Sequence, residues 1–252
     1  MRAVLFSSRN LKEIARDPLS YVFCLGFPMI MLILFQVLNQ YTGGNTPNFE
    51  LPVLTPGITV FSYSFVMLYL ALSVSKDRAT SFLLRIYASP MTKTDFVLSY
   101  TIPGLLIAAA QTVICYALSA VIGLLTGASF MNLPQSLASG LSVLPVSLFF
   151  IGGGILFGSL FSEKSAPGLC SIIISLSGIL GGAWMPLEAM GDFETFCRFL
   201  PFYPAVSIGR YFGGVSVSAD IPLQYLVIAL YSAVIFLLAI AGFGHAIHKD
   251  AN

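Results

Sequence analysis

Long apolar runs separated by short polar segments dominate the hydrophobic pattern of this chain. Each run lies near or above the roughly 20 residues that a helix needs to cross the hydrocarbon core of a bilayer. Charged residues make up only 9% of the 252 residues, whereas soluble domains usually contain about 25%. The pattern therefore predicts an all-α integral membrane protein with six transmembrane helices. The six runs are 19–38, 54–74, 96–125, 137–161, 166–184 and 223–247.

The first 18 residues have a helical period that separates charged from apolar positions. Leu11 and Ile14 lie on one side, and Pro18 is expected to end the helix. We expect this helix to lie in the membrane interface, with its basic residues against lipid headgroups. These basic residues are Arg2, Arg9, Lys12 and Arg16.

Basic residues are unevenly distributed among the polar segments. Of the 12 Lys and Arg residues, ten precede the first run, lie in the charged segment 76–95, or follow the fourth and sixth runs. Short segments rich in Lys and Arg stay on the cytoplasmic side of a membrane. The distribution predicts a multi-pass protein of the cell (plasma or inner) membrane with both termini in the cytoplasm.

The segment 181–222 is rich in aromatic residues and broken by prolines. A mostly apolar segment that is too interrupted to span is expected to lie at the interface or to re-enter the bilayer, with its backbone shielded by protein. Amphipathic rings at headgroup depth favour this position. The residues that define the predicted re-entrant segment are Trp184, Pro186, Phe199, Pro201, Tyr203 and Pro204.

Small residues recur at four-residue spacing within the runs, for example Gly154 and Gly158. This spacing lets helix backbones approach closely in a membrane. Polar groups are scarce in the runs: Gln36 and Gln111 are the main ones, and we interpret each as a hydrogen bond between helices. The four cysteines are interpreted as small core residues.

The sequence predicts no catalytic, metal or cofactor site. His245 and His248 lack an HExxH pattern or a neighbouring pair of acids, so we interpret them as helix-end residues. The stretch 158–165 has Glu163 where a phosphate-binding loop requires glycine. Because no chain of ionisable groups crosses the membrane, an ion gradient has no evident route. The net charge of +1 argues against a nucleic-acid partner.

Three stretches together resemble the small permease subunits of type-2 ABC exporters, and the resemblance covers essentially the whole chain. They are KDRATSFLLRIYASP at 76–90, Leu54-Thr55-Pro56-Gly57, and Gly181-Gly182-Ala183-Trp184-Met185-Pro186. The resemblance implies one permease domain, 1–252, that is not itself an enzyme. It also implies a second permease copy, in a homodimer or a heterodimer, and two ABC ATP-binding subunits that carry ATP and magnesium.

The resemblance further implies that the cytoplasmic loop 76–95 contains a coupling helix that contacts the ATP-binding subunit. Three apolar residues of this loop share one helical face, and two arginines lie seven residues apart. Thr92 and Asp95 match the capping box of the helix that follows. The predicted coupling residues are Arg78, Phe82, Leu83, Arg85, Ile86 and Pro90.

We therefore expect the membrane permease of an ATP-driven exporter of a hydrophobic or amphipathic compound, such as a drug, antibiotic, peptide or lipid-like molecule. Spans without charge favour selection of cargo by apolar contact and shape. Export of a polysaccharide on a lipid carrier is an alternative, although it favours a more polar lining than these runs offer. An intramembrane enzyme or an assembly protein is the third hypothesis.

Overall fold

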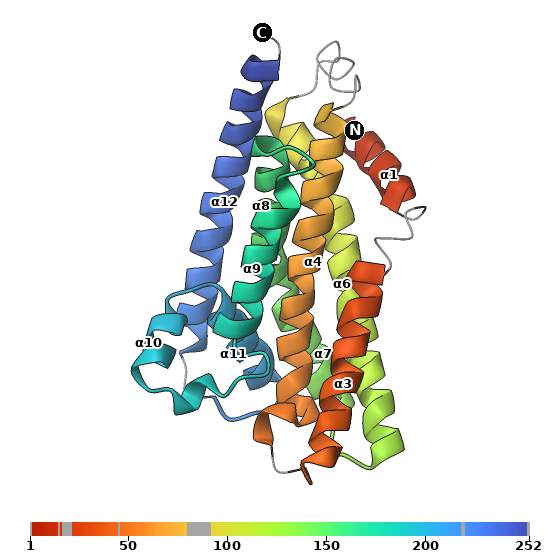
Figure 1. Cartoon of the computed structure of the whole chain (residues 1–252), viewed down its shortest axis with the longest axis vertical. Helices are drawn as coiled ribbons and strands as arrows, with labels where there is room; N and C mark the ends of the chain where they lie inside the picture. Colours follow the sequence, from red (N-terminus) through yellow and green to blue (C-terminus); the bar gives the residue numbers. More distant parts are fainter. Residues whose placement is uncertain are drawn as a thin grey trace.

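The computed structural model describes residues 2–14, 16, 22–44, 46–79, 92–217 and 220–250, and within them residues 2–6, 14, 93, 188 and 244–250 by their backbone alone. The described residues form a bundle of helices and contain no strand (Figure 1). The helices are α1 (Arg2–Ile14), η1 (Val22–Gly26), α3 (Phe27–Tyr41), η2 (Pro47–Phe49), α4 (Leu51–Ala79), α6 (Lys93–Thr126), α7 (Leu133–Val143), η3 (Leu144–Val146), α8 (Ser147–Leu160), α9 (Ala166–Leu180), η4 (Leu187–Ala189), α10 (Asp192–Arg198), α11 (Phe202–Phe212) and α12 (Ile221–Asp250).

Five helical segments of the described chain are long and apolar enough to cross a membrane: Val22–Tyr41, Leu51–Ala79, Thr94–Thr126, Leu133–Leu160 and Ile221–Phe243. They correspond to five of the six predicted runs. The remaining run, predicted at 166–184, forms α9, an apolar helix of 15 residues. This helix is shorter than the roughly 20 residues of a full span, and a turn follows it at Gly181.

Helix α4 is the central helix of the bundle. Of its most apolar stretch 78% is buried, against 17% for α12 and 33% for α6. It packs against α8 and α9 on one side and α3 and α6 on the other (Figure 1). Since α4 is covered by protein on most sides, any movement of it must be shared with its neighbours.

The predicted close approach of small residues is found where α8 crosses α4. A Cβ atom added at Gly154 would lie 2.5 Å from the carbonyl oxygen of Met67, and one added at Gly158 would lie 2.7 Å from that of Ala71. A side chain at either position would therefore force the two backbones apart.

The two ends of the bundle differ in what they contain (Figure 1). The proximal end carries both chain ends, helix α1, the end of α4 and the start of α6. The distal end carries the start of α4 together with α10 and α11. The capping box predicted for α6 is confirmed: the Thr92 hydroxyl accepts from the amide of Asp95, and the Thr92 amide donates to the Asp95 carboxylate.

Candidate functional site

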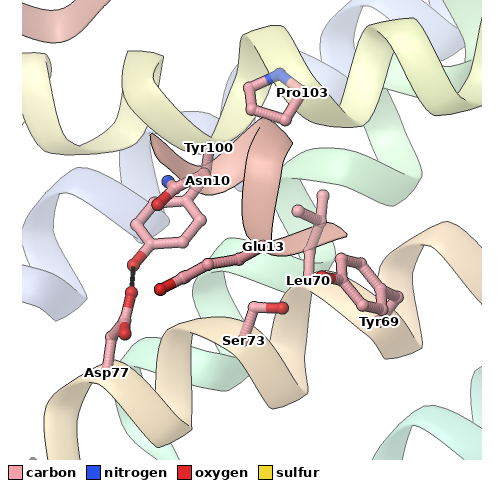
Figure 2. A pocket seen from close by; sticks show the side chains of 8 residues that line it. All are labelled: Asn10, Glu13, Tyr69, Leu70, Ser73, Asp77, Tyr100 and Pro103. Carbon is pink, nitrogen blue, oxygen red and sulfur yellow. Dashed lines mark hydrogen bonds between the residues drawn. The ribbon is translucent and has the colours of Figure 1, made fainter. Parts of the chain in front are cut away.

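A charged junction joins three helices at the proximal end. Asp77, in the last turns of α4, has a side chain that is only 12% exposed. The Arg9 guanidinium of α1 lies 3.3 Å from one carboxylate oxygen of Asp77, and the Tyr100 hydroxyl of α6 donates a hydrogen bond to the other (Figure 2). One carboxylate therefore connects α1, α4 and α6.

The side of α1 that faces the bundle strengthens this junction. Arg9 also pairs with Glu13 one turn later, at 2.7 Å, and the Asn10 amide donates to the carbonyl of Ser99 in α6. Burial on its own would lower the pKa of Arg9, but the hydrogen bonds and negative charges of Glu13 and Asp77 outweigh it and raise the pKa. Arg9 is therefore firmly cationic, as the ion pair with Asp77 requires.

Figure 2 shows the small cleft beside this pair, where side chains of α1, α4 and α6 converge. The Glu13 side chain of α1 points toward the Asp77–Tyr100 bond, and Ser73 of α4 also lines the cleft. Of the basic residues predicted to meet headgroups, Arg9 bonds within the protein, whereas Lys12 and Arg16 are exposed. The Arg2 side chain lies outside the described residues.

Arg78 binds the fourth helix of the proximal end. Its guanidinium donates to the carbonyls of Gly158, at 3.1 Å, and Phe161, at 3.4 Å. Both carbonyls belong to the C-terminal end of α8, where a cation is favoured by the helix dipole and by the unsatisfied carbonyl groups. The other predicted coupling residues, Phe82, Leu83, Arg85, Ile86 and Pro90, lie outside the described part of the chain.

At the distal end, two of the stretches singled out in the sequence meet each other. A Cβ atom added at Gly57, in the first turns of α4, would lie 2.8 Å from both the Cα and the carbonyl oxygen of Ala183. A Cβ atom added at Gly209, in α11, would lie 2.7 Å from the ring of Pro56. The stretch 54–57 is thus enclosed by the turn 181–186 on one side and by α11 on the other.

Trp184 fixes this turn against the bundle. Its ring stacks on Phe35 of α3 with centroids 5.5 Å apart, and it meets Phe61 of α4 edge-on at 5.0 Å. Gly178 of α9 leaves the space for the indole, because a Cβ atom there would lie 2.4 Å from it. Such aromatic pairs contribute about 0.5 to 1.5 kcal/mol beyond the area they bury.

Arg210 is a buried cation in the same junction. Its side chain lies in α11, and the residue is 2% exposed. It donates to the carbonyl of Val53 at 3.1 Å and to that of Gly182 at 2.6 Å. Arg210 therefore ties α11 both to the first turn of α4 and to the turn that follows α9. In the sequence, Arg210 is one of the two basic residues between the fifth and sixth apolar runs.

Apart from Trp184, which is half-buried, the predicted re-entrant residues separate into two groups. Pro201, Tyr203 and Pro204 are buried, whereas Pro186 and Phe199 are exposed, the latter by 70%. Four further exposed aromatic residues of the same segment are Phe193, Phe196, Tyr211 and Phe212. The segment thus presents aromatic rings outward while its proline-rich part packs against protein.

Glu194 organises the short helix α10. It accepts hydrogen bonds from Arg198 at 2.8 Å and from the Tyr203 hydroxyl at 2.8 Å. Burial alone would raise the pKa of Glu194, but these hydrogen bonds, with the charge of Arg198, outweigh it and lower the pKa. The carboxylate therefore links α10 to the start of α11.

Hydroxyl pairs within the spans form a feature that sequence reasoning missed. Thr55 donates to Ser119 at 2.8 Å, and the hydroxyls of Tyr63 and Thr112 lie 2.6 Å apart, so that α4 and α6 are bonded twice. Gln111, as predicted, bonds between helices: its amide donates to the carbonyls of Cys24 and Ser62. The carbonyl of Cys24 belongs to the π-helical turn η1, a geometry often found at functional sites.

The described residues contain no cluster of His, Cys, Asp or Glu that is suited to a metal ion. All four cysteines are buried, in agreement with their interpretation as core residues. In the two junctions, ion pairs and hydrogen bonds hold the helices together, and closely packed backbones fix their spacing.

Apolar helices of spanning length around a buried central helix define a multi-pass membrane protein. The sequence profile of the ABC-2 type transporter family matches residues 3–213, so the chain belongs to this family. The resemblance to type-2 ABC permeases is thereby confirmed. Such chains are the membrane component of the transporter, they bind no cofactor themselves, and a separate subunit hydrolyses ATP. A comparison with curated protein sequences finds no match.

Proposed function

We propose that this chain is the permease of an ATP-driven exporter that moves a hydrophobic or amphipathic compound out of the cell. The family match over residues 3–213 carries the proposal. Spans without charged side chains in their central parts favour cargo that is recognised through apolar contact and shape. Two copies of the permease, identical or related, would work with two ATP-binding subunits.

In this proposal the proximal end faces the cytoplasm. The distribution of basic residues supports this orientation, as does the position of both chain ends at the same end of the bundle (Figure 1). Helix α9 would serve as a short sixth span, continued on the distal side by the turn 181–186. Helices α10 and α11 would form the re-entrant segment, held at the interface by their exposed aromatic rings.

The proximal junction supports a route for force from the ATP-binding subunit. The predicted coupling segment 76–95 begins within the last turn of α4, which carries Asp77 and Arg78. A push on this segment would displace the end of α4 and, through Asp77 and Arg78, also α1, α6 and α8. Packed helices respond to such a push by moving as rigid bodies.

The distal junction is proposed to transmit this movement to the outer side. Because Gly57 of α4 meets the backbone of Ala183 in the turn 181–186, and the Pro56 ring of α4 packs on Gly209 of α11, a shift of α4 would carry both elements with it. The re-entrant segment would then open a route outward at the interface between the two permease copies.

Co-purification and vesicle transport test the proposed function. Solubilised under mild conditions from its native host, the full-length chain should bring with it an ATP-binding subunit of the ABC type. Vesicles that contain the pair should move an amphipathic dye only when ATP is supplied. A chain that is purified without any ATPase, and that transports without ATP, would exclude this function.

Substitutions in the coupling segment test the proposed mechanism. Phe82→Asp and Arg85→Glu should leave ATP hydrolysis in place while transport is lost, because the proposal assigns both side chains to the contact with the partner subunit. Tyr41→Asp is the matched control, since Tyr41 is an aromatic residue that is 87% exposed at the end of α3. Normal transport by both coupling variants would refute the assignment of this segment.

A further inference from the structure

The surface of the bundle contains a groove between α6 and α7 with a volume of about 480 Å³. Among the residues that line it none is charged. Its rim is formed by large apolar side chains that are exposed by more than half: Val113 at 68%, Leu137 at 58% and Leu141 at 65%. Volumes of 300 to 1,000 Å³ with mostly apolar walls are typical of ligand sites.

The length of the groove matches one leaflet of a bilayer. It follows α6 from Ala109 to Ala120, which at about 1.5 Å per residue is roughly 16 Å. Half of a hydrocarbon core of about 30 Å is about 15 Å. Both walls belong to helices of spanning length, and α7 lies in the distal half of the bundle (Figure 1). The groove therefore opens to the acyl chains of the distal leaflet.

The lining of the groove indicates the kind of occupant. Its residues are mostly apolar and belong to helices of spanning length, so acyl chains fill the groove in a membrane unless another protein covers it. A second copy of the permease that covered the groove would exclude lipid, and the labelling experiment below separates these two outcomes.

From this shape, chemistry and position we propose that the groove between α6 and α7 binds one acyl chain of a phospholipid from the distal leaflet. The proposal requires only a membrane around the chain. It does not depend on ATP, on cargo or on the direction of transport.

The occupant would contact a side chain that is bonded to the distal junction. Tyr116 forms part of the groove wall, and its hydroxyl lies 2.5 Å from that of Ser139 in α7. Ser139 in turn donates to the carbonyl of Gly209 in α11 at 2.6 Å. An acyl chain packed against Tyr116 would therefore help to hold α6, α7 and α11 in this arrangement.

Photolabelling tests the proposal directly. The full-length chain, with its ATP-binding partner where the two co-purify, is placed in vesicles of phosphatidylethanolamine and phosphatidylglycerol with a trace of phospholipid that carries a diazirine within one acyl chain. After illumination without ATP, mass spectrometry locates the label. We expect it to be concentrated in residues 109–120 and 130–144.

Two filling substitutions and one control complete the test. Ala117→Trp and Ala120→Phe place a bulky ring in the groove. They should lower labelling there by about tenfold or more, because the acyl chain of the lipid loses its apolar contacts with the groove. Ala233→Trp is the control, since Ala233 is exposed on α12 and does not line the groove. Label spread evenly over the exposed faces of α3 and α12, or unchanged in whichever filling variant folds, would overturn the proposal.

Discussion

The two ends of α4 are attached to their neighbours by different kinds of interaction. At the proximal end the attachments are made by long charged side chains: Arg9 to Asp77, and Arg78 to the end of α8. At the distal end they are made by backbone in direct contact, as between Gly57 and Ala183, and by the buried Arg210. The two kinds of attachment respond differently to displacement.

A charged side chain can follow its partner through a change of rotamer, so the proximal junction tolerates movement between helices. A contact between backbones has no such freedom, since close-packed interiors respond to strain as units. The comparison teaches that the last turn of α4, beyond its close contacts with Gly154 and Gly158, is adjustable, whereas its first turns are fixed. In a transporter driven from the proximal side, side chains would transmit force to the last turn of α4, and backbone contacts would transmit it from the first turns of α4 to the distal elements.

Enlarging Gly57 should produce the largest effect, because the distal junction has no free space. Gly57→Ala places a Cβ atom 2.8 Å from two backbone atoms of Ala183, and overpacking of this kind costs up to about 3 kcal/mol. The thermal denaturation midpoint of the purified chain should fall clearly. Gly168→Ala in α9 is the matched control: a Cβ atom there meets nothing within 4 Å. Equal midpoints for the two variants would show that the distal end is not fixed by backbone contact.

Removing the cation of the distal junction should come next. Arg210→Met keeps much of the side-chain volume but leaves the carbonyls of Val53 and Gly182 without this donor. Each buried acceptor that loses its partner costs about 1 to 3 kcal/mol, so a loss of about 2 kcal/mol in thermal stability is expected. Arg198→Met, whose side chain is 41% exposed in the parent, should cost much less. If Arg210→Met and Arg198→Met lower the midpoint equally, Arg210 does not hold α11 to α4 and to the turn after α9.

The sequence predicts the features that depend on local pattern. The apolar runs, the amphipathic α1, the Thr92–Asp95 capping box and the close approach at Gly154 and Gly158 all follow from spacing along one helix. The hydrogen bonding of Gln111 follows from the cost of an unpaired amide in an apolar span. The family resemblance also comes from such local stretches, and the match over residues 3–213 agrees with it.

The pairings across the bundle are not accessible in the same way. Arg9 and Asp77 are 68 residues apart, and Arg210 and Val53 are 157 residues apart. Whether they meet depends on how each helix is rotated about its axis, and near-uniform apolar spans leave that rotation undetermined. For the same reason, the contact of the stretch 54–57 with the turn 181–186 emerges only from the assembled bundle. A lone arginine in the apolar segment 202–212 was the available signal for Arg210.

Neutralising the proximal carboxylate should have a moderate effect on stability. Asp77→Asn removes the charge that pairs with Arg9 while it retains an acceptor for the Tyr100 hydroxyl. Partly exposed ion pairs contribute up to about 1 kcal/mol. A double-mutant cycle with Arg9→Gln, read by thermal denaturation, should therefore give a coupling energy of that order.

Transport should be affected more than stability if the proximal end takes up force, so ATP hydrolysis per transported molecule should rise in Asp77→Asn. Glu163→Gln is the control, because it neutralises an exposed carboxylate between α8 and α9 that does not pair with Arg9 or Tyr100. Zero coupling energy, together with normal transport by Asp77→Asn, would remove the proximal junction from the mechanism.

The smallest expected effect concerns Glu194, which binds α10 to the distal end by a side-chain pair of the proximal kind. Its lowered pKa means that the folded protein favours the carboxylate, so its contribution to stability is complete above the ordinary Glu pKa of 4.5 and is lost as pH falls through the lower folded pKa. Glu194→Gln should therefore lower the denaturation midpoint slightly at neutral pH, by less than about 1 kcal/mol. This difference from the parent should vanish at acid pH. A difference that stays constant down to acid pH would mean that Glu194 acts through shape and packing, and the distal end would then contain no titratable attachment at this position.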